Sequence, residues 1–208
     1  MTPSQIPNWS ARLDVDAASL SRLHDTLVSQ AQGHGLLELA YRTLPSPVGT
    51  LLVAATQQGV VRVAFDREGH EQVLTALSER VSPRILQAPR RLDQVARQLD
   101  DYFAGRRHAF EVPLDFRLSR GFRSEVLQHL RQISYGRTES YTEVAVAAGH
   151  AKAVRAVGTA CATNPLPVVV PCHRVLRSDG SLGGYIGGLA AKQTLLDLEA
   201  GVRQPPLG

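Results

Sequence analysis

A cysteine and a histidine stand side by side near the end of the chain, in the run Pro171–Val175 (PCHRV). The thiolate is the nucleophilic form of cysteine, and a free thiol titrates near pH ~8.5, so a nearby group must take its proton. His173 is the adjacent base. The apolar run Val168–Val170 predicts a short buried strand that ends at Cys172. Strand ends position reactive groups well, so the pair indicates nucleophilic chemistry.

Such a base is oriented by a third group, and Glu199 is the candidate. It lies in the predicted helix 189–200 on the face that carries leucines, where an unpaired carboxylate would be costly. A buried imidazole would offset that cost, but a glutamate at a helix end can also reach solvent, and the spacing leaves both interpretations open. Neighbours in an extended segment point to opposite faces, so a bend after Cys172 or a bridging water would have to connect it to His173. An inert buried cysteine is the other interpretation of Cys172.

The positive charge of the chain is concentrated in its second part. The 208 residues carry a net charge of +4. Residues 1–118 hold 13 basic and 13 acidic side chains, whereas residues 119–208 hold 10 basic and 6 acidic ones, so the entire excess lies in the second part. This asymmetry favours a polyanionic partner for residues 119–208. A solvated surface in an arginine-rich protein is the alternative.

The remaining composition restricts the class of protein. The apolar content of 43% is ordinary for a globular chain, and no apolar run reaches the roughly 18 residues that a membrane helix needs. Residues 1–10 do not have the pattern of a secretory signal. Cys161 and Cys172 are too few for a disulfide framework or a cysteine-based zinc site. We therefore expect a cytoplasmic protein that binds no metal and no membrane.

The first part of the chain predicts an extension followed by an α/β domain. The extension covers residues 1–35, and residues 16–32 within it predict an amphipathic helix. The domain covers residues 36–118. Its predicted elements are strands at 37–44, 50–56 and 60–65, helices at 70–81 and 90–103, and an extended return at 110–114.

Residues 119–208 predict a helical domain. Helices are expected at 121–133, 142–148, 151–162 and 189–200. A turn with Gly149 joins the second and third, which is a helix-turn-helix pattern, although any α-hairpin looks the same. Lys152, Arg155 and Thr159 share one face of the third helix, opposite an apolar face. A basic stripe of this kind suits a helix that lies against phosphates.

Together these motifs resemble the O6-alkylguanine-DNA alkyltransferase family. The match runs in order and spacing over about residues 119–201, and the PCHRV run is its most specific part. Its motifs are Ser140-Tyr141, Arg155–Gly158, Asn164-Pro165, Pro171–Val175, Gly184-Tyr185 and Glu199. Residues 36–115 resemble the smaller domain of that family less specifically. The implied fold is α+β, with a small ribonuclease-H-like α/β domain followed by a helical DNA-binding domain that carries the helix-turn-helix and the active-site loop.

The resemblance implies a reaction and a role for each catalytic residue. Members of this family transfer an alkyl group irreversibly from O6 of guanine in DNA to their own cysteine, so each molecule acts once. Cys172 would be the acceptor, His173 would take its proton through a water, and Glu199 would hold His173. Asn164 would tie the recognition helix to the active-site strand, or cap that helix. Tyr141 would donate a hydrogen bond or proton to the departing guanine, or simply pack a helix N-terminus.

The resemblance also implies how DNA and base are held. The helix with Arg155 would lie in the minor groove, and Arg155 would fill the gap that the flipped base leaves, with a simple phosphate contact as its alternative. The further DNA contacts would come from Lys152, Ala156, Gly158 and Thr159. The base pocket would be formed by Pro167, Val175, Tyr185, Ile186 and Lys192. Ile186 stands where the family often has a small hydroxylated residue, so its branched side chain would reshape the pocket.

Three functions are weighed on these grounds. The first is DNA repair by alkyl transfer from O6-alkylguanine, with O4-alkylthymine left open and no cofactor. The second is a relative that binds the lesion without transfer, which the presence of Cys172 argues against. The third is a cysteine hydrolase, which would leave the helix with Arg155 and the localised charge unexplained. The expected partner is double-stranded DNA that carries the lesion, bound by a protein that is monomeric in solution, with cooperativity along DNA left open.

Overall fold

The computed structural model describes residues 16–202, and the chain divides into two compact units between Leu37 and Glu38. Most of the described residues of the first unit form α1 (Ala17–Gly33). Asp16 caps this helix, because its carboxylate accepts a hydrogen bond from the backbone N–H of Ser19 at 2.6 Å. The helix predicted within the extension is confirmed for these residues. Residues 1–10, where no secretory signal is expected, lie outside the described range.

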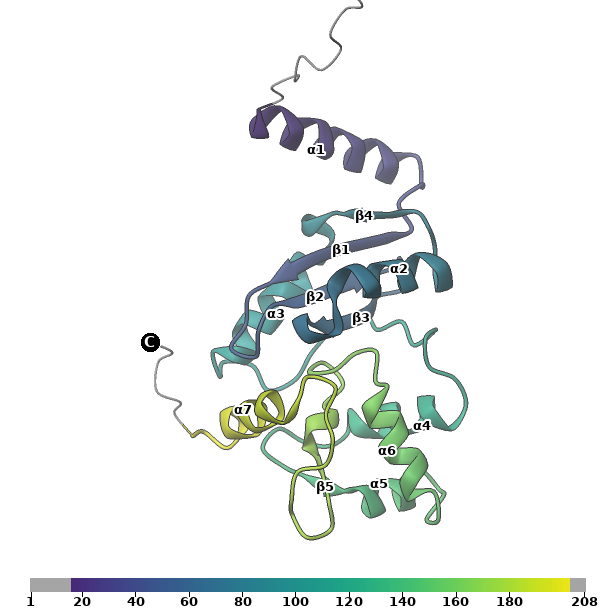
Figure 1. Ribbon diagram of the computed structural model, residues 1–208, viewed down its shortest axis with the longest axis vertical. Helices are drawn as coiled ribbons and strands as arrows, with labels where there is room; N and C mark the ends of the chain where they lie inside the picture. The colour runs from purple at the N-terminus through teal and green to yellow at the C-terminus, as the bar shows by residue number, and fades with distance from the viewer. Residues whose placement is uncertain (1–15, 203–208) are drawn as a thin grey trace, which may run out of the picture. The chain divides into compact units, whose positions relative to one another are not determined.

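The second unit begins with a four-stranded sheet (Figure 1). Its strands, in the spatial order β3-β2-β1-β4, are β1 (Leu39–Leu44), β2 (Leu51–Ala55), β3 (Val60–Phe65) and β4 (Ile85–Gln87). β1, β2 and β3 pair antiparallel, and β4 pairs parallel with β1. Every residue of β2 is buried, so both faces of the sheet are covered.

Two helices accompany the sheet, each preceded by a 3₁₀ turn. η1 (Asp66–Glu68) leads into α2 (His70–Arg80), and η2 (Pro89–Leu92) leads into α3 (Asp93–Phe103). The apolar side chains of α2 pack with those of the three antiparallel strands in one core cluster. α3 has one strongly apolar face, and its Tyr102 is fully buried. We call residues 38–118 the sheet half.

Residues 119–202 form the helical half. Its elements are α4 (Phe122–Leu130), β5 (Glu139–Ser140), α5 (Tyr141–Ala147), α6 (Val154–Ala162), η3 (Cys172–Arg174), β6 (Val175–Leu176) and α7 (Leu189–Glu199). α4, α5 and α6 pack on one another, and β5 pairs parallel with β6. The fold is therefore α+β, as the sequence predicted, while the domain boundaries at 36–118 and 119–208 stay predictions. None of the helices found in residues 16–202 has the length and apolar character needed to cross a bilayer.

The sheet half contains one strand that the sequence did not predict. β4 was missed because its three residues lie between Pro83 and Pro89 and are too few to show an alternating pattern. The return predicted at 110–114 meets the sheet through one isolated bridge, between Val60 and Leu114. Pro113 has no N–H to donate, so a longer ladder cannot form there.

The helical half corrects two further predictions. Val168–Val170 is a turn rather than a strand, and Val168 has a φ of 72°, a left-handed conformation that is rare for a β-branched residue. The helix predicted from residue 151 begins only at Val154, because the Ala153 N–H bonds to the His150 carbonyl in a preceding turn. Lys152 therefore lies in that turn and not on the helix.

Gly59 lies where the β2–β3 turn meets the returning chain, and it provides a test of this fold. A Cβ on Gly59 would lie 2.3 Å from the Pro113 carbonyl oxygen, and the φ of Gly59 is 143°. We expect Gly59→Ala to lower the free energy of unfolding by roughly 2–4 kcal/mol. Gly105→Ala is the control, because φ there is 69° but a Cβ would meet no atom within 4 Å; it should cost about 1–2 kcal/mol. If urea denaturation showed equal losses of unfolding free energy for Gly59→Ala and Gly105→Ala, the close packing at Gly59 would be contradicted.

Candidate active site

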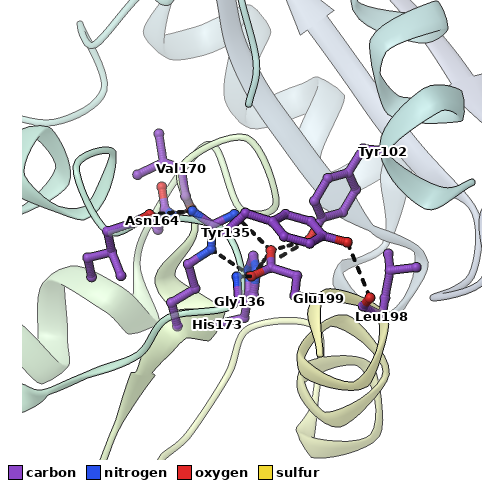
Figure 2. A network of polar contacts seen from close by, with 10 residues as sticks. Tyr102, Tyr135, Gly136, Asn164, Val170, His173, Leu198 and Glu199 are labelled. Carbon is purple, nitrogen blue, oxygen red and sulfur yellow. Dashed lines mark hydrogen bonds and ion pairs between the residues drawn. The ribbon is translucent and has the colours of Figure 1, made fainter. Parts of the chain in front are cut away.

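A buried carboxylate, that of Glu199, joins both halves of the second unit (Figure 2). Its Oε1 accepts hydrogen bonds from His173 Nε2 at 2.9 Å, Arg174 Nη2 at 2.8 Å and Tyr102 Oη at 2.7 Å. Its Oε2 accepts from Arg174 Nε at 2.8 Å and from the Gly136 N–H at 3.1 Å. Of the two positions that the spacing left open, Glu199 therefore takes the buried one beside His173 and does not face solvent.

Local structure explains why these groups meet. η3 turns the chain at Cys172–Arg174, so consecutive side chains are not forced onto opposite faces as they would be in a strand. His173 and Arg174 both reach Glu199, which is the last residue of α7. Of the two links that the sequence left open, a bend after Cys172 or a bridging water, the bend is present as a 3₁₀ turn.

The electrostatics of the cluster determine where its protons lie. Burial alone would raise the pKa of Glu199, but hydrogen bonds from His173 and Arg174 outweigh it and lower the pKa well below its usual range. Burial lowers the pKa of His173, so at neutral pH its ring is uncharged and Arg174 supplies the balancing positive charge. An ionised carboxylate only accepts hydrogen bonds, so His173 Nε2 carries the hydrogen and Nδ1 is left as the basic nitrogen. Nδ1 is buried and bonds to no protein atom among residues 16–202.

Cys172 is a protonated thiol at rest. Burial raises its pKa to about 11, against the lowering effects of a hydrogen bond from Asn164 and of the charge on Lys192. Asn164 Nδ2 lies 3.2 Å from the sulfur. Only 1% of Cys172 is exposed, so the sulfur reacts out of contact with bulk water. Formation of the thiolate therefore requires a base, and within residues 16–202 the sulfur makes no direct hydrogen bond to His173.

Asn164 also builds the turn that precedes the cysteine. Its Nδ2 donates to the Val170 carbonyl at 2.9 Å, and its Oδ1 accepts from the Leu166 N–H at 2.9 Å. These bonds close residues 164–170 into a compact loop and are the physical reason why Val168–Val170 is not extended. Pro167 lies buried within this loop.

Tyr141 and Lys192 lie beside each other, and each interacts electrostatically with Cys172. Tyr141 opens α5 behind an N-cap at Ser140, and burial raises its pKa to about 12. A Cβ on Gly183 would lie 2.3 Å from the Tyr141 hydroxyl oxygen, so only glycine permits this approach. Lys192 is fully buried and donates through Nζ to the Val175 carbonyl, with Nζ 6.0 Å from the Tyr141 ring centre.

The glycine-rich loop 183–188 is held against the sheet half. Tyr185 packs its ring edge-to-face on Phe65 of β3, with centroids 5.6 Å apart, and its hydroxyl is buried. A Cβ on Gly187 would lie 2.7 Å from the Phe65 ring. Ile186 lines a groove of about 460 Å³ between α2 and the end of α6, together with Arg62 and Pro165. The side chain of Ile186 is thus half-buried in that groove.

The predicted DNA-contacting residues lie on one exposed surface. Arg155, Ala156 and Thr159 of α6 are exposed, and Lys152 is exposed in the turn before the helix. Gly158 has open space where a side chain would stand. The opposite face of α6, with Val157, Ala160 and Cys161, is buried. The basic side chain of Arg155, on the exposed face of α6, can therefore contact a ligand without any change in the buried core.

Comparison with known proteins identifies the family. Residues 121–201 match the DNA-binding domain of 6-O-methylguanine DNA methyltransferase, and residues 39–116 match its ribonuclease-like domain. A methylated-DNA–protein-cysteine methyltransferase from Mycolicibacterium paratuberculosis is 40% identical over 161 residues, which cover 77% of this chain and 92% of the relative. The constitutive enzyme of that name from Bacillus subtilis is 35% identical over 163 residues, covering 76% and 94%. The chain belongs to the 6-O-methylguanine DNA methyltransferase family.

Solved structures agree with this family and with the fold. The Mycobacterium tuberculosis O6-methylguanine methyltransferase superposes with a TM-score of 0.68 at 36% identity, covering 81% of this chain and 96% of that one. A structure of the Mycobacterium tuberculosis protein in complex with DNA superposes with a TM-score of 0.66 at 36% identity, covering 78% and 94%. The resemblance inferred from the sequence motifs is confirmed.

Sequence reasoning missed two members of the methyltransferase site. Arg174 was recognised only as part of the PCHRV run, although its guanidinium binds both oxygens of Glu199. Tyr102 was assigned to a helix of the sheet half, and nothing near it in sequence points to the site. The helical spacing of apolar residues in α3 indicates that Tyr102 faces the core, but not what its hydroxyl meets there.

The buried cluster predicts a loss of stability in acid. His173 and Glu199 both have lowered pKa values in the folded chain, so the unfolded chain binds protons first as the pH falls. Their contribution is complete above pH ~6.5, the unfolded value for histidine, and declines below it, with Glu199 adding to the decline below pH ~4.3. Urea denaturation between pH 4.5 and 8 should show this slope. His173→Gln should remove the part of the stability loss that begins just below neutral pH. His150→Gln, at an exposed site, should retain that loss. The same slope in both variants would contradict the assignment.

Proposed function

We propose that this chain repairs DNA by transferring the alkyl group of O6-alkylguanine to its own Cys172, in a single irreversible turnover. The observation that supports this most directly is the Glu199–His173 pair beside a buried, protonated thiol, within a chain of the methyltransferase family. The relatives are named for the same transfer, from methylated DNA to a protein cysteine.

The reaction balances without a cofactor. The Cys172 sulfur forms a bond to the alkyl carbon as the bond from that carbon to guanine O6 breaks, and the electron pair stays on O6. The thiol proton passes to His173 Nδ1 through a water, since Nδ1 is buried and faces no protein partner within residues 16–202. The departing guanine takes a proton or hydrogen bond from Tyr141, whose hydroxyl remains protonated at neutral pH because its pKa is about 12. The thioether cannot release the alkyl group, so the protein is consumed.

The supporting residues stabilise the charge that develops on sulfur. Asn164 donates a hydrogen bond to the sulfur at 3.2 Å. The Lys192 charge also favours the thiolate, as its effect on the pKa of Cys172 shows. Val175, Tyr185 and Pro167 complete the pocket. We assign the backbone N–H of Ile186 to guanine O6, and Ile186 also lines the groove beside α2.

We further propose that α6 lies in the minor groove of double-stranded DNA. The exposed Arg155 would enter the base stack where the alkylated base is flipped out, flanked by Ala156, Gly158 and Thr159, with Lys152 contacting phosphate from the preceding turn. The concentration of positive charge in residues 119–208 supports this surface, and the relative solved with DNA supports the partner. We assign residues 36–118 to the ribonuclease-like domain, residues 119–208 to the DNA-binding domain, and the cytoplasm as the compartment.

Mass analysis of the protein after incubation with duplex DNA that carries O6-methylguanine tests the reaction. One methyl group should appear on the Cys172 peptide per protein molecule, and Cys172→Ala should abolish transfer while retaining DNA binding. Cys161→Ala is the matched control and should still transfer, because burial raises the pKa of Cys161 far above its usual range and its thiol lies on the buried face of α6. Binding with an unmodified wild-type protein would favour a lesion-binding function, and repeated turnover a hydrolase.

Comparison of duplex DNA with the free modified base tests the role of Arg155. Arg155→Ala should slow transfer from duplex DNA by on the order of tenfold or more but leave transfer from the free O6-alkylguanine base nearly unchanged, because only the duplex substrate requires base flipping. Arg131→Ala removes an exposed arginine that is outside α6, at the C-terminal end of α4, and should affect both substrates little. Equal losses on both substrates for Arg155→Ala would exclude the flipping role.

A further inference from the structure

Tyr102 is the one group of the sheet half, among the described residues, that donates a hydrogen bond to the buried carboxylate. It lies in the last turn of α3, is fully buried, and directs its hydroxyl to Glu199 Oε1 at 2.7 Å, with His173 Nε2 3.4 Å away (Figure 2). We propose that Tyr102 is a positioning residue that acts through Glu199 to set the orientation and basicity of His173. This inference rests on the proposed alkyl transfer and gives the sheet half a direct part in it.

The hydroxyl of Tyr102 and the imidazole N–H of His173 donate hydrogen bonds to the same oxygen, Glu199 Oε1. Glu199 Oε1 accepts from Tyr102, His173 and Arg174, whereas Oε2 accepts only from Arg174 and Gly136. Burial and the charge of Glu199 raise the pKa of Tyr102 far above its usual range, so the hydroxyl remains a donor throughout the working pH range. A third donor on Oε1 withdraws negative charge from the oxygen that faces the imidazole N–H.

This sharing has a defined consequence for proton transfer. The negative charge on Oε1 is what stabilises His173 once it has accepted the thiol proton, whereas burial and the positive charges of Arg174 and Lys192 oppose that protonation. A stronger field from Glu199 would hold a proton on His173 before the thiol reacts, which removes the base. A carboxylate without a fixed direction would let the imidazole turn away from the sulfur. The Tyr102 hydroxyl limits both effects.

The ring of Tyr102 has a separate role, which allows the hydroxyl to be tested alone. The ring packs against Phe103, Phe110 and Tyr135, with centroids 5.4, 5.2 and 6.1 Å away. Tyr102→Phe keeps this aromatic cluster and removes only the hydroxyl. Tyr135→Phe is a matched control from the same cluster, because its hydroxyl donates to the Leu198 carbonyl at 3.2 Å and not to Glu199.

Single-turnover transfer measured from pH 5 to 9 tests the proposal. Near neutral pH, Tyr102→Phe should react on the order of tenfold more slowly than the wild type, since a hydrogen bond to a charged group is lost. The acidic limb of the pH–rate profile of Tyr102→Phe, where His173 becomes protonated, should move to higher pH by roughly one unit or less. Tyr135→Phe should keep the wild-type limb.

A second substitution reverses the sign and keeps the test decisive if Tyr102→Phe folds poorly. Site-specific replacement of Tyr102 by 3-fluorotyrosine makes the hydroxyl a stronger donor at nearly the same size, so the acidic limb should move to lower pH. A limb that stays in place in both Tyr102 variants would overturn the proposal. A wild-type protein that transfers no alkyl group would instead refute the proposed function itself, so the two failures are distinguishable.

Discussion

The buried carboxylate of Glu199 is the constraint on which the site depends. An ionised carboxylate out of water costs several kcal/mol unless charge and hydrogen bonds compensate it. Here the compensation is complete, because Arg174 supplies the opposite charge and five hydrogen bonds occupy the two oxygens. If one partner were removed, part of the negative charge of Glu199 would be left uncompensated in an apolar interior. The positions of the partners are therefore constrained as strongly as that of the carboxylate.

This requirement fixes elements that are distant in sequence. α7 must end at Glu199, η3 must turn His173 and Arg174 toward it, and α3 must bring Tyr102 from the sheet half. The turn at Gly136 must also bring a backbone N–H to the carboxylate, with a φ of 71° and little room for a Cβ. The same bonds that stabilise the charge therefore join the sheet half to the helical half. The stability of the fold and the orientation of His173 therefore depend on the same hydrogen bonds to Glu199.

The sequence predicts this site only as far as local motifs reach. The PCHRV run and the leucine-bearing face of α7 made Cys172, His173 and Glu199 candidates, because motif and helical periodicity are local properties. Spacing alone left Glu199 open between a buried and a solvent-facing position, and the family resemblance supplied its expected role. Tyr102 could not be placed in the same way, since its contact spans 97 positions and depends on how α3 packs. The strand predicted at Val168–Val170 was wrong for a related reason. Apolar composition favoured a strand, but side-chain bonds from Asn164 close the backbone into a turn.

The opposing influences on the pKa of Cys172 suit the proposed role of a nucleophile that is used once. A permanently ionised thiolate would react with any small electrophile and be lost before it met damaged DNA. Burial holds the thiol neutral, while Asn164 and Lys192 lower the cost of the thiolate without making it the resting form. In the proposed reaction, the proton leaves only when His173, oriented by Glu199, can accept it as the alkyl carbon reaches the sulfur. Because that reaction would leave a permanent thioether, selectivity must come before it, and a buried, protonated thiol provides it.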